Sequence, residues 1–154
     1  MNGDNLTRHP VAIETSELRK RVRAVIDHSR KNAAARRKTL EDATAAYNEL
    51  LTRTATPLVQ MLANALRAEG YNFTVFTPNG GLRMALAKSG DDFIEFALET
   101  SQDQPFAALR VNRTRGSRVV QHERPVKDRT PVDRLGEEDV LQALLEELGP
   151  FVER

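Results

Sequence analysis

A long run of residues without a glycine constrains the fold of this chain more than any other feature. Residues 16–69 contain one proline, Pro57, and their apolar side chains recur at helical spacing. Ser16 followed by Glu17 is typical of a helix start, and Gly70 is typical of a helix stop. The sequence therefore predicts a helical segment over residues 16–69.

Two positions inside this segment favour a break. Thr39 begins a Thr-Leu-Glu-Asp sequence that fits a capping box with aspartate in place of glutamate. Thr56 and Pro57 fit an N-cap followed by proline at the first helical position. The segment is therefore either one long kinked helix or two or three shorter helices, and the sequence leaves these alternatives open.

After Gly70 the period of the apolar residues changes from about 3.6 to about 2 residues. Four runs of alternating apolar and polar or small residues follow within residues 71–112, and each ends in turn residues such as Asn79-Gly80. These closely spaced turns predict antiparallel neighbours, because a parallel crossover needs about a dozen residues or more. A fifth strand is expected around Arg118–Arg124.

The spacing of the turns also predicts how the strands pair. A two-residue turn in the first hairpin pairs Val75 with Met84, and a three-residue turn in the second pairs Met84 with Phe96. These side chains then share one face of the sheet. The sheet therefore has one apolar face and one mixed, polar face, on which Glu95 lies near Arg110.

The last predicted element is a short helix over residues 137–148, with acidic residues at its N-terminus and Gly149-Pro150 at its end. Together the elements predict an α+β fold. A long N-terminal helical segment precedes a four- to five-stranded antiparallel β-meander, and the short C-terminal helix packs on the apolar face of the sheet.

The same pattern predicts the domain organisation. We expect a flexible arm over residues 1–15 and a single α+β domain over residues 16–154. Within this domain, residues 16–56 form a projecting helix, or a helical hairpin broken near Thr39, and residues 57–154 form the globular body.

Catalytic and metal-binding patterns are missing from the sequence. The chain has no cysteine, which excludes disulfides, thiolate metal sites and a thiol nucleophile. His9, His28 and His122 do not have a metal-binding spacing, and no serine lies in a nucleophile elbow. We therefore expect a non-catalytic protein that needs no cofactor and no metal.

The sequence also lacks a recognisable signal that would target the chain to another compartment. Its first residues do not have the charged and then apolar pattern of a secretory signal. No apolar run approaches the roughly 18 residues that span a bilayer. We expect a cytoplasmic protein without a membrane partner.

The net charge of +1 hides an uneven distribution. Nine basic and two acidic residues give the segment Thr15–Leu40 a charge of +7, whereas residues 136–154 carry −5. A second basic cluster surrounds the hairpin expected at residues 110–118. Such cationic segments either solvate the helix and the turn or bind nucleic-acid phosphates without sequence preference. The candidate phosphate-binding residues are Arg19, Lys20, Arg23, Arg30, Lys31, Arg36, Arg37, Lys38, Arg110, Arg113, Arg115 and Arg118.

A heptad-like spacing suggests a surface for self-association. The residues Leu40, Ala43, Tyr47 and Leu50 follow alternating steps of three and four positions, which is shorter than the run that identifies a coiled coil. Of three possible functions, the sequence most favours a homodimeric protein-interaction module, and it does not identify a protein partner. The alternative is a sequence-independent nucleic-acid-binding protein, and the third is a small-molecule binder or enzyme with no recognisable motif.

Overall fold

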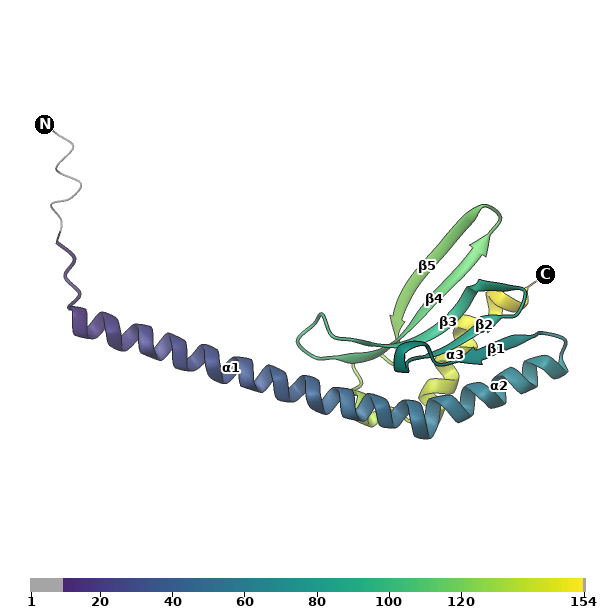
Figure 1. Cartoon of the computed structure of the whole chain (residues 1–154), viewed down its shortest axis with the longest axis horizontal. Helices are drawn as coiled ribbons and strands as arrows, with labels where there is room; N and C mark the ends of the chain where they lie inside the picture. The colour runs from purple at the N-terminus through teal and green to yellow at the C-terminus, as the bar shows by residue number, and fades with distance from the viewer. Residues whose placement is uncertain (1–9, 154) are drawn as a thin grey trace, which may run out of the picture. The chain divides into compact units, whose positions relative to one another are not determined.

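The computed structural model describes residues 10–153 and confirms the predicted α+β fold (Figure 1). It divides into two compact units, one ending at Lys38 and the other beginning at Thr39. Residues 1–9 of the predicted arm lie outside the described residues, and Pro10–Glu14 form neither helix nor strand. The helices are α1 (Thr15–Leu50), α2 (Thr56–Ala68) and α3 (Glu137–Val152), and a π-helical turn at Leu51–Ala55 joins α1 to α2.

The structure decides between the alternatives for the N-terminal segment. The helix continues through Thr39, so the predicted break and the hairpin at this position are wrong. At Pro57 the chain widens into the π-helical turn, in which the Thr56 amide donates to the Leu51 carbonyl five residues earlier. A proline ring clashes with the carbonyl four residues before it, and a wider turn removes this clash without ending the helix.

The helical segment ends where the sequence predicts. Gly70 has a φ of 92°, in the left-handed region that favours glycine. The Gly70 amide donates to the Arg67 carbonyl at 3.0 Å, and the Tyr71 amide donates to the Leu66 carbonyl at 2.9 Å. These two bonds form a Schellman motif, which satisfies carbonyl groups at the end of α2 and turns the chain toward the sheet.

Five antiparallel strands follow in the order β1-β2-β3-β4-β5, so the fifth strand is confirmed. The first hairpin has the predicted register, with Val75 opposite Met84. Asn79 and Gly80 at its turn both have positive φ, as an Asn-Gly turn requires. The strands are β1 (Phe73–Phe76), β2 (Leu82–Leu86), β3 (Ser89–Glu99), β4 (Phe106–Arg115) and β5 (Arg118–Pro125).

The register predicted for the second hairpin is wrong by two residues. Met84 pairs with Ile94 rather than with Phe96, because β3 begins at Ser89. Residues 90–92 are typical of a turn, but they form an irregularity within β3 and not the turn between β2 and β3. A slip of two residues leaves every side chain on its predicted face, so the apolar and polar faces of the sheet are unchanged.

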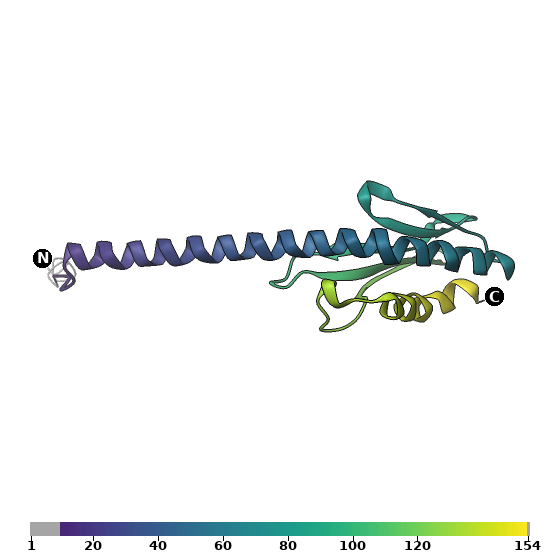
Figure 2. The same cartoon turned by 90° about the horizontal axis from the view of Figure 1, so that it is seen from below.

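The apolar face of the sheet is covered by α2, α3 and the C-terminal part of α1. Figures 1 and 2 show α2 and α3 on the same side of the sheet. The core joins Val59 of α2 and Leu144 of α3 to Met84, Ile94 and Leu109 of the strands. These five side chains are almost fully buried, and burial of apolar area of this kind provides most of the stability of a small domain.

The C-terminal helix is longer than predicted, because it continues through Gly149-Pro150 to Val152. A proline in the last turn removes only one helical hydrogen bond. The extension places Phe151 in the core, with its ring edge-on to Phe73 at a centroid distance of 6.3 Å. The Tyr71 hydroxyl also donates to the Val152 carbonyl at 3.2 Å. These contacts offset the lost hydrogen bond and explain why Pro150 does not end the helix.

Candidate interaction surfaces

The residues predicted to mediate self-association do not form one exposed surface. Tyr47 and Leu50 are 7% and 5% exposed and belong to the chain's own core, so these two side chains are already covered within the chain. Ala43 is half-buried, and Leu40 is exposed. Their heptad-like spacing therefore results from packing of the end of α1 within its own chain.

Exposed apolar residues lie further toward the N-terminus of α1. Leu40 and four side chains in the first three turns are between 42% and 65% exposed, and all are large. At about 100° per residue they fall within roughly 100° of the helix circumference. These five residues, called the apolar stripe below, are Leu18, Val22, Val25, Ile26 and Leu40.

The basic residues of α1 are more ordered than their scatter along the sequence suggests. The continuous helix places seven of them within about 120° of its circumference, beside the apolar stripe. All seven are exposed, and the one acidic residue in this sector before Glu41 is Asp27. This basic sector consists of Arg19, Lys20, Arg23, Arg30, Lys31, Arg37 and Lys38.

Two arginines of α1 lie outside the basic sector. Arg21 points to another side of the helix, where its Nε donates to the Glu17 carboxylate at 3.2 Å. Arg36, one of the predicted phosphate-binding residues, falls among the positions of the apolar stripe. The other seven predicted phosphate-binding residues of α1 lie in the basic sector, so Arg36 does not share one surface with them.

The predicted basic cluster on the β4–β5 hairpin is divided by the sheet. Arg113 and Arg115 share one side of the hairpin with Arg118, which is the cross-strand partner of Arg115. Arg110 lies on the opposite face, where its Nε donates to the Glu123 carboxylate at 3.1 Å. The hairpin therefore carries three cations near Gly116, while the fourth is paired elsewhere.

Arg110 belongs to a row of alternating charges that crosses the polar face of the sheet. The register aligns Arg83, Glu95, Arg110 and Glu123 on four consecutive strands. Arg83 pairs with Glu95, and its guanidinium lies 3.9 Å from the centre of the Phe93 ring. Each cation in this row therefore has an adjacent carboxylate, so the row carries no net charge and offers no strong attraction to an anionic or cationic ligand.

Two buried polar atoms lack a hydrogen-bond partner among residues 10–153. They are the Tyr47 hydroxyl and the side-chain oxygen of Asn112, whose amide nitrogen donates to the Asp91 carbonyl. Burial raises the pKa of Tyr47 well above its usual range, and the carboxylate of Glu95 raises it further. The Tyr47 phenol therefore stays protonated and neutral, and it is unsuited to acid–base chemistry near neutral pH.

The histidine and acidic side chains among the described residues do not form a metal-binding cluster. Residues 10–153 do not bring together three histidine, aspartate or glutamate side chains that could hold a metal ion. His122 contacts Glu147 at 2.8 Å on the surface, and His28 is exposed on α1. His9 lies outside the described residues. His122 and Arg124 of β5 thus contact Glu147 and Glu146 of α3 and link the sheet to this helix.

Other features of the chain do not identify a function. No helix within the described part of the chain is long and apolar enough to cross a lipid bilayer. No protein-family model, curated protein or solved structure matches this chain.

Proposed function

We propose that the protein is a non-catalytic interaction module that self-associates through the apolar stripe of α1. The observation that carries the proposal is the contrast along one helix face: Leu50 is buried by its own chain, whereas Leu18 and Val25 are 53% and 65% exposed. An amphipathic helix gains stability chiefly by burying its apolar face. A second copy of the chain has the same apolar stripe, so two copies that pack stripe against stripe cover the apolar residues of each other.

The charge of α1 is compatible with this arrangement. Two copies would each bring the +7 segment Thr15–Leu40, whose repulsion opposes association. The basic sector lies beside and behind the apolar stripe, so pairing through the stripe directs both basic sectors outward. Their separation then exceeds the Debye length of about 8 Å at physiological salt, and the repulsion is largely screened.

An antiparallel pairing fits the stripe better than a parallel one. Parallel helices in register place Arg36 against Arg36 within the apolar contact, which costs the burial of two like charges. Antiparallel helices that cross at Ser29 place Leu18 beside Leu40 and Val25 beside the small residue Ala33. We therefore propose an antiparallel pair with Ser29 at its centre.

Sedimentation equilibrium of the full chain tests self-association. The wild type is expected to dimerise in the micromolar range, because the stripe is short and association itself is costly. The double variant Val22→Glu, Val25→Glu should raise the dimer dissociation constant at least about tenfold. Met61→Glu is the matched control, because Met61 is 64% exposed on α2, outside the stripe. A monomeric wild type at millimolar concentration contradicts the proposal.

The absence of native cysteine permits a direct test of orientation. Single variants Ser29→Cys and Leu18→Cys are oxidised under mild conditions, and the disulfide-linked dimer is quantified. An antiparallel pair centred at Ser29 cross-links through the first variant and not through the second, because cysteine Cα atoms more than about 7 Å apart cannot be bridged. Cross-linking of both variants indicates parallel helices instead.

Nucleic-acid binding is the second candidate function, and the basic sector is the observation that favours it. Seven exposed cations share one side of a helix, and such a surface can follow a phosphate backbone. The sector stays exposed in the proposed dimer, so the two functions are compatible. The polar face of the sheet does not support this function, because Arg110 is paired with Glu123.

Fluorescence anisotropy with an arbitrary duplex of about 20 base pairs tests this candidate. Binding should weaken steeply with salt, and Arg23→Glu should reduce both the affinity and the salt slope, the latter by about one. Arg21→Glu is the matched control, because it makes the same change in charge two residues away on another side of α1. Equal effects of the two variants would exclude the sector as the binding surface.

A further inference from the structure

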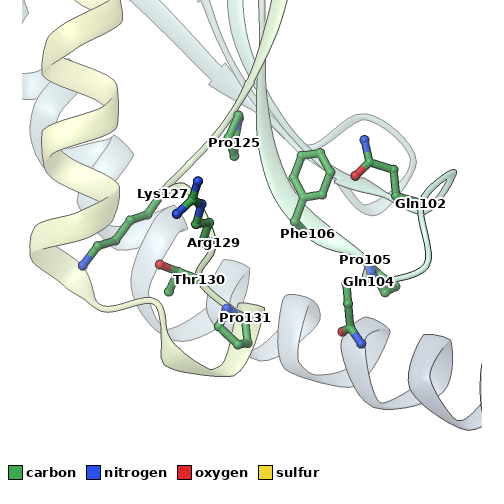
Figure 3. A pocket seen from close by; sticks show the side chains of 9 residues that line it. All are labelled: Gln102, Gln104, Pro105, Phe106, Pro125, Lys127, Arg129, Thr130 and Pro131. Atoms are coloured by element: carbon green, nitrogen blue, oxygen red, sulfur yellow. The ribbon is translucent and has the colours of Figure 1, made fainter.

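A second surface with ligand-binding character lies between two connecting loops, far from the apolar stripe in the sequence. The loop between β3 and β4 and the loop after β5 face each other across a cavity of about 560 Å³ (Figure 3). This volume lies within the range of small-molecule sites. Gln102, Gln104 and Phe106 line one side, and residues 125–131 line the other.

The walls of the cavity are apolar and preformed. Pro105, Phe106, Pro125 and Pro131 provide rings on both sides. A proline ring fixes the backbone φ. The loops therefore lose little conformational entropy when a ligand binds. A flat apolar body between these rings would exchange water for ring contacts on both of its faces.

The polar groups of the cavity select for negative charge. Lys127 and Arg129 line it, and its described lining contains no carboxylate. The Lys127 ammonium lies 3.1 Å from the Asp139 carboxylate on α3, so its charge is balanced. Arg129 forms no ion pair with a described residue, which leaves an uncompensated guanidinium at the cavity. A guanidinium donates two parallel hydrogen bonds to a carboxylate or a phosphate.

The backbone at Arg129 provides an independent indication. Arg129 has a φ of 55°, a conformation that glycine and asparagine adopt at lower cost than arginine. The hydroxyl of the next residue, Thr130, donates to the Asp128 carbonyl at 3.0 Å and closes this turn. Strained residues of this kind concentrate at binding sites, where the side chain has a use that the fold does not require.

A neighbouring pocket, lined by acidic side chains, indicates where the charged group of a ligand would lie. It shares Gln104, Pro105 and Pro131 with the cavity, and it is lined further on by Asp42 and Asp133. An anionic group would be repelled by these carboxylates and attracted by Arg129. We propose that the cavity binds a small anion with a flat apolar body, whose carboxylate or phosphate lies at Arg129 and whose body lies between Phe106 and the prolines.

Amide chemical shifts of the full chain, titrated with phenyl phosphate, test the proposal. The shifts should change at residues 102–106 and 125–131, with a dissociation constant in the millimolar range that suits a fragment of this size. Phenol lacks the anion and inorganic phosphate lacks the ring, so each should bind at least about tenfold more weakly. Equal binding of either compound, or no shift in these loops, overturns the assigned ligand class.

A pair of variants separates a binding role of Arg129 from a structural one. Arg129→Asn removes the guanidinium and suits the left-handed backbone, so it should weaken phenyl phosphate at least about tenfold while the melting temperature stays equal or rises by about 2 °C. Arg134→Asn makes the same change at an exposed residue outside the cavity, and it should leave binding unaltered. Unchanged binding in Arg129→Asn, or perturbation by the ligand at the basic sector alone, contradicts the proposal.

Discussion

The two ends of α1 present the same helix face in two different states. Toward the C-terminus the face carries Tyr47 and Leu50 into the core, and toward the N-terminus it carries Leu18, Val22 and Val25 into solvent. The spacing of the apolar residues is the same in both parts. Helical periodicity therefore identifies a face that needs to be covered, but it does not identify what covers it.

Truncating one apolar side chain at each end of α1 should give very unequal losses of stability. Leu50→Ala should lower the free energy of unfolding by about 2–5 kcal/mol, because it leaves a cavity in the core. Val25→Ala should cost less than about 0.5 kcal/mol in the monomer. Urea denaturation at low protein concentration measures both. Similar losses in the two variants would show that Val25 is buried by its own chain.

Tyr47 is buried on the core side of this face, but its hydroxyl has no hydrogen-bond partner among the described residues. Tyr47→Phe removes this hydroxyl and keeps the ring, so the free energy of unfolding should rise by about 1 kcal/mol. The same urea experiment detects the change. A loss of stability in Tyr47→Phe would indicate that the hydroxyl is hydrogen-bonded in solution.

The smallest expected effect is a dependence of stability on acid that arises in the second unit. The Ser101 hydroxyl and amide hold the pKa of Glu99 at about 2, and the Gly136 amide together with Lys127 lowers the pKa of Asp139. Unfolded carboxyls titrate near 4, so the folded chain binds fewer protons just below this pH. Stability is therefore complete above about pH 5 and is lost as the pH falls toward 2.

Asp139→Asn tests this acid dependence. The variant should lose stability at pH 7 and show a shallower decline of the urea midpoint between about pH 5 and pH 2. Glu41→Gln is a matched control, because Glu41 is an exposed acid of α1 for which no ion pair is described. An identical decline in Asp139→Asn and the wild type would show that Asp139 has the same pKa in both states.

The sheet was predictable because its determinants are local. Alternation in β1 and β2 and the Asn79-Gly80 turn specify a register by themselves. The second hairpin differs because Gly90, which is typical of a turn, lies in an irregular part of β3. A slip of two residues preserves the faces, so periodicity cannot distinguish the two registers.

Sequence patterns were insufficient to predict the end of a helix or the partner of a helix face where tertiary contacts determine them. Pro150 is typical of a helix end, but the core position of Phe151 keeps α3 helical beyond it. Leu50 follows a heptad-like spacing that fits a partner helix as well as its own core. The basic residues look scattered along the sequence, and they share one side only when their angular positions on a single helix are compared.

The cavity at Arg129 had no counterpart in the sequence patterns. Its walls come from loops about twenty residues apart in the chain, which the β4–β5 hairpin brings together. The one local indication is that Arg129 occupies a left-handed position, and sequence alone does not reveal backbone conformation at an arginine.

Amide hydrogen exchange as a function of protein concentration tests most directly whether a second copy covers the apolar stripe. Residues 15–40 should exchange rapidly when the protein is dilute and become protected as its concentration rises into the dimer range. Residues 58–66 of α2, which pack in their own core, should be equally protected throughout. Protection of residues 15–40 that does not change with concentration, or that never appears, would contradict the account.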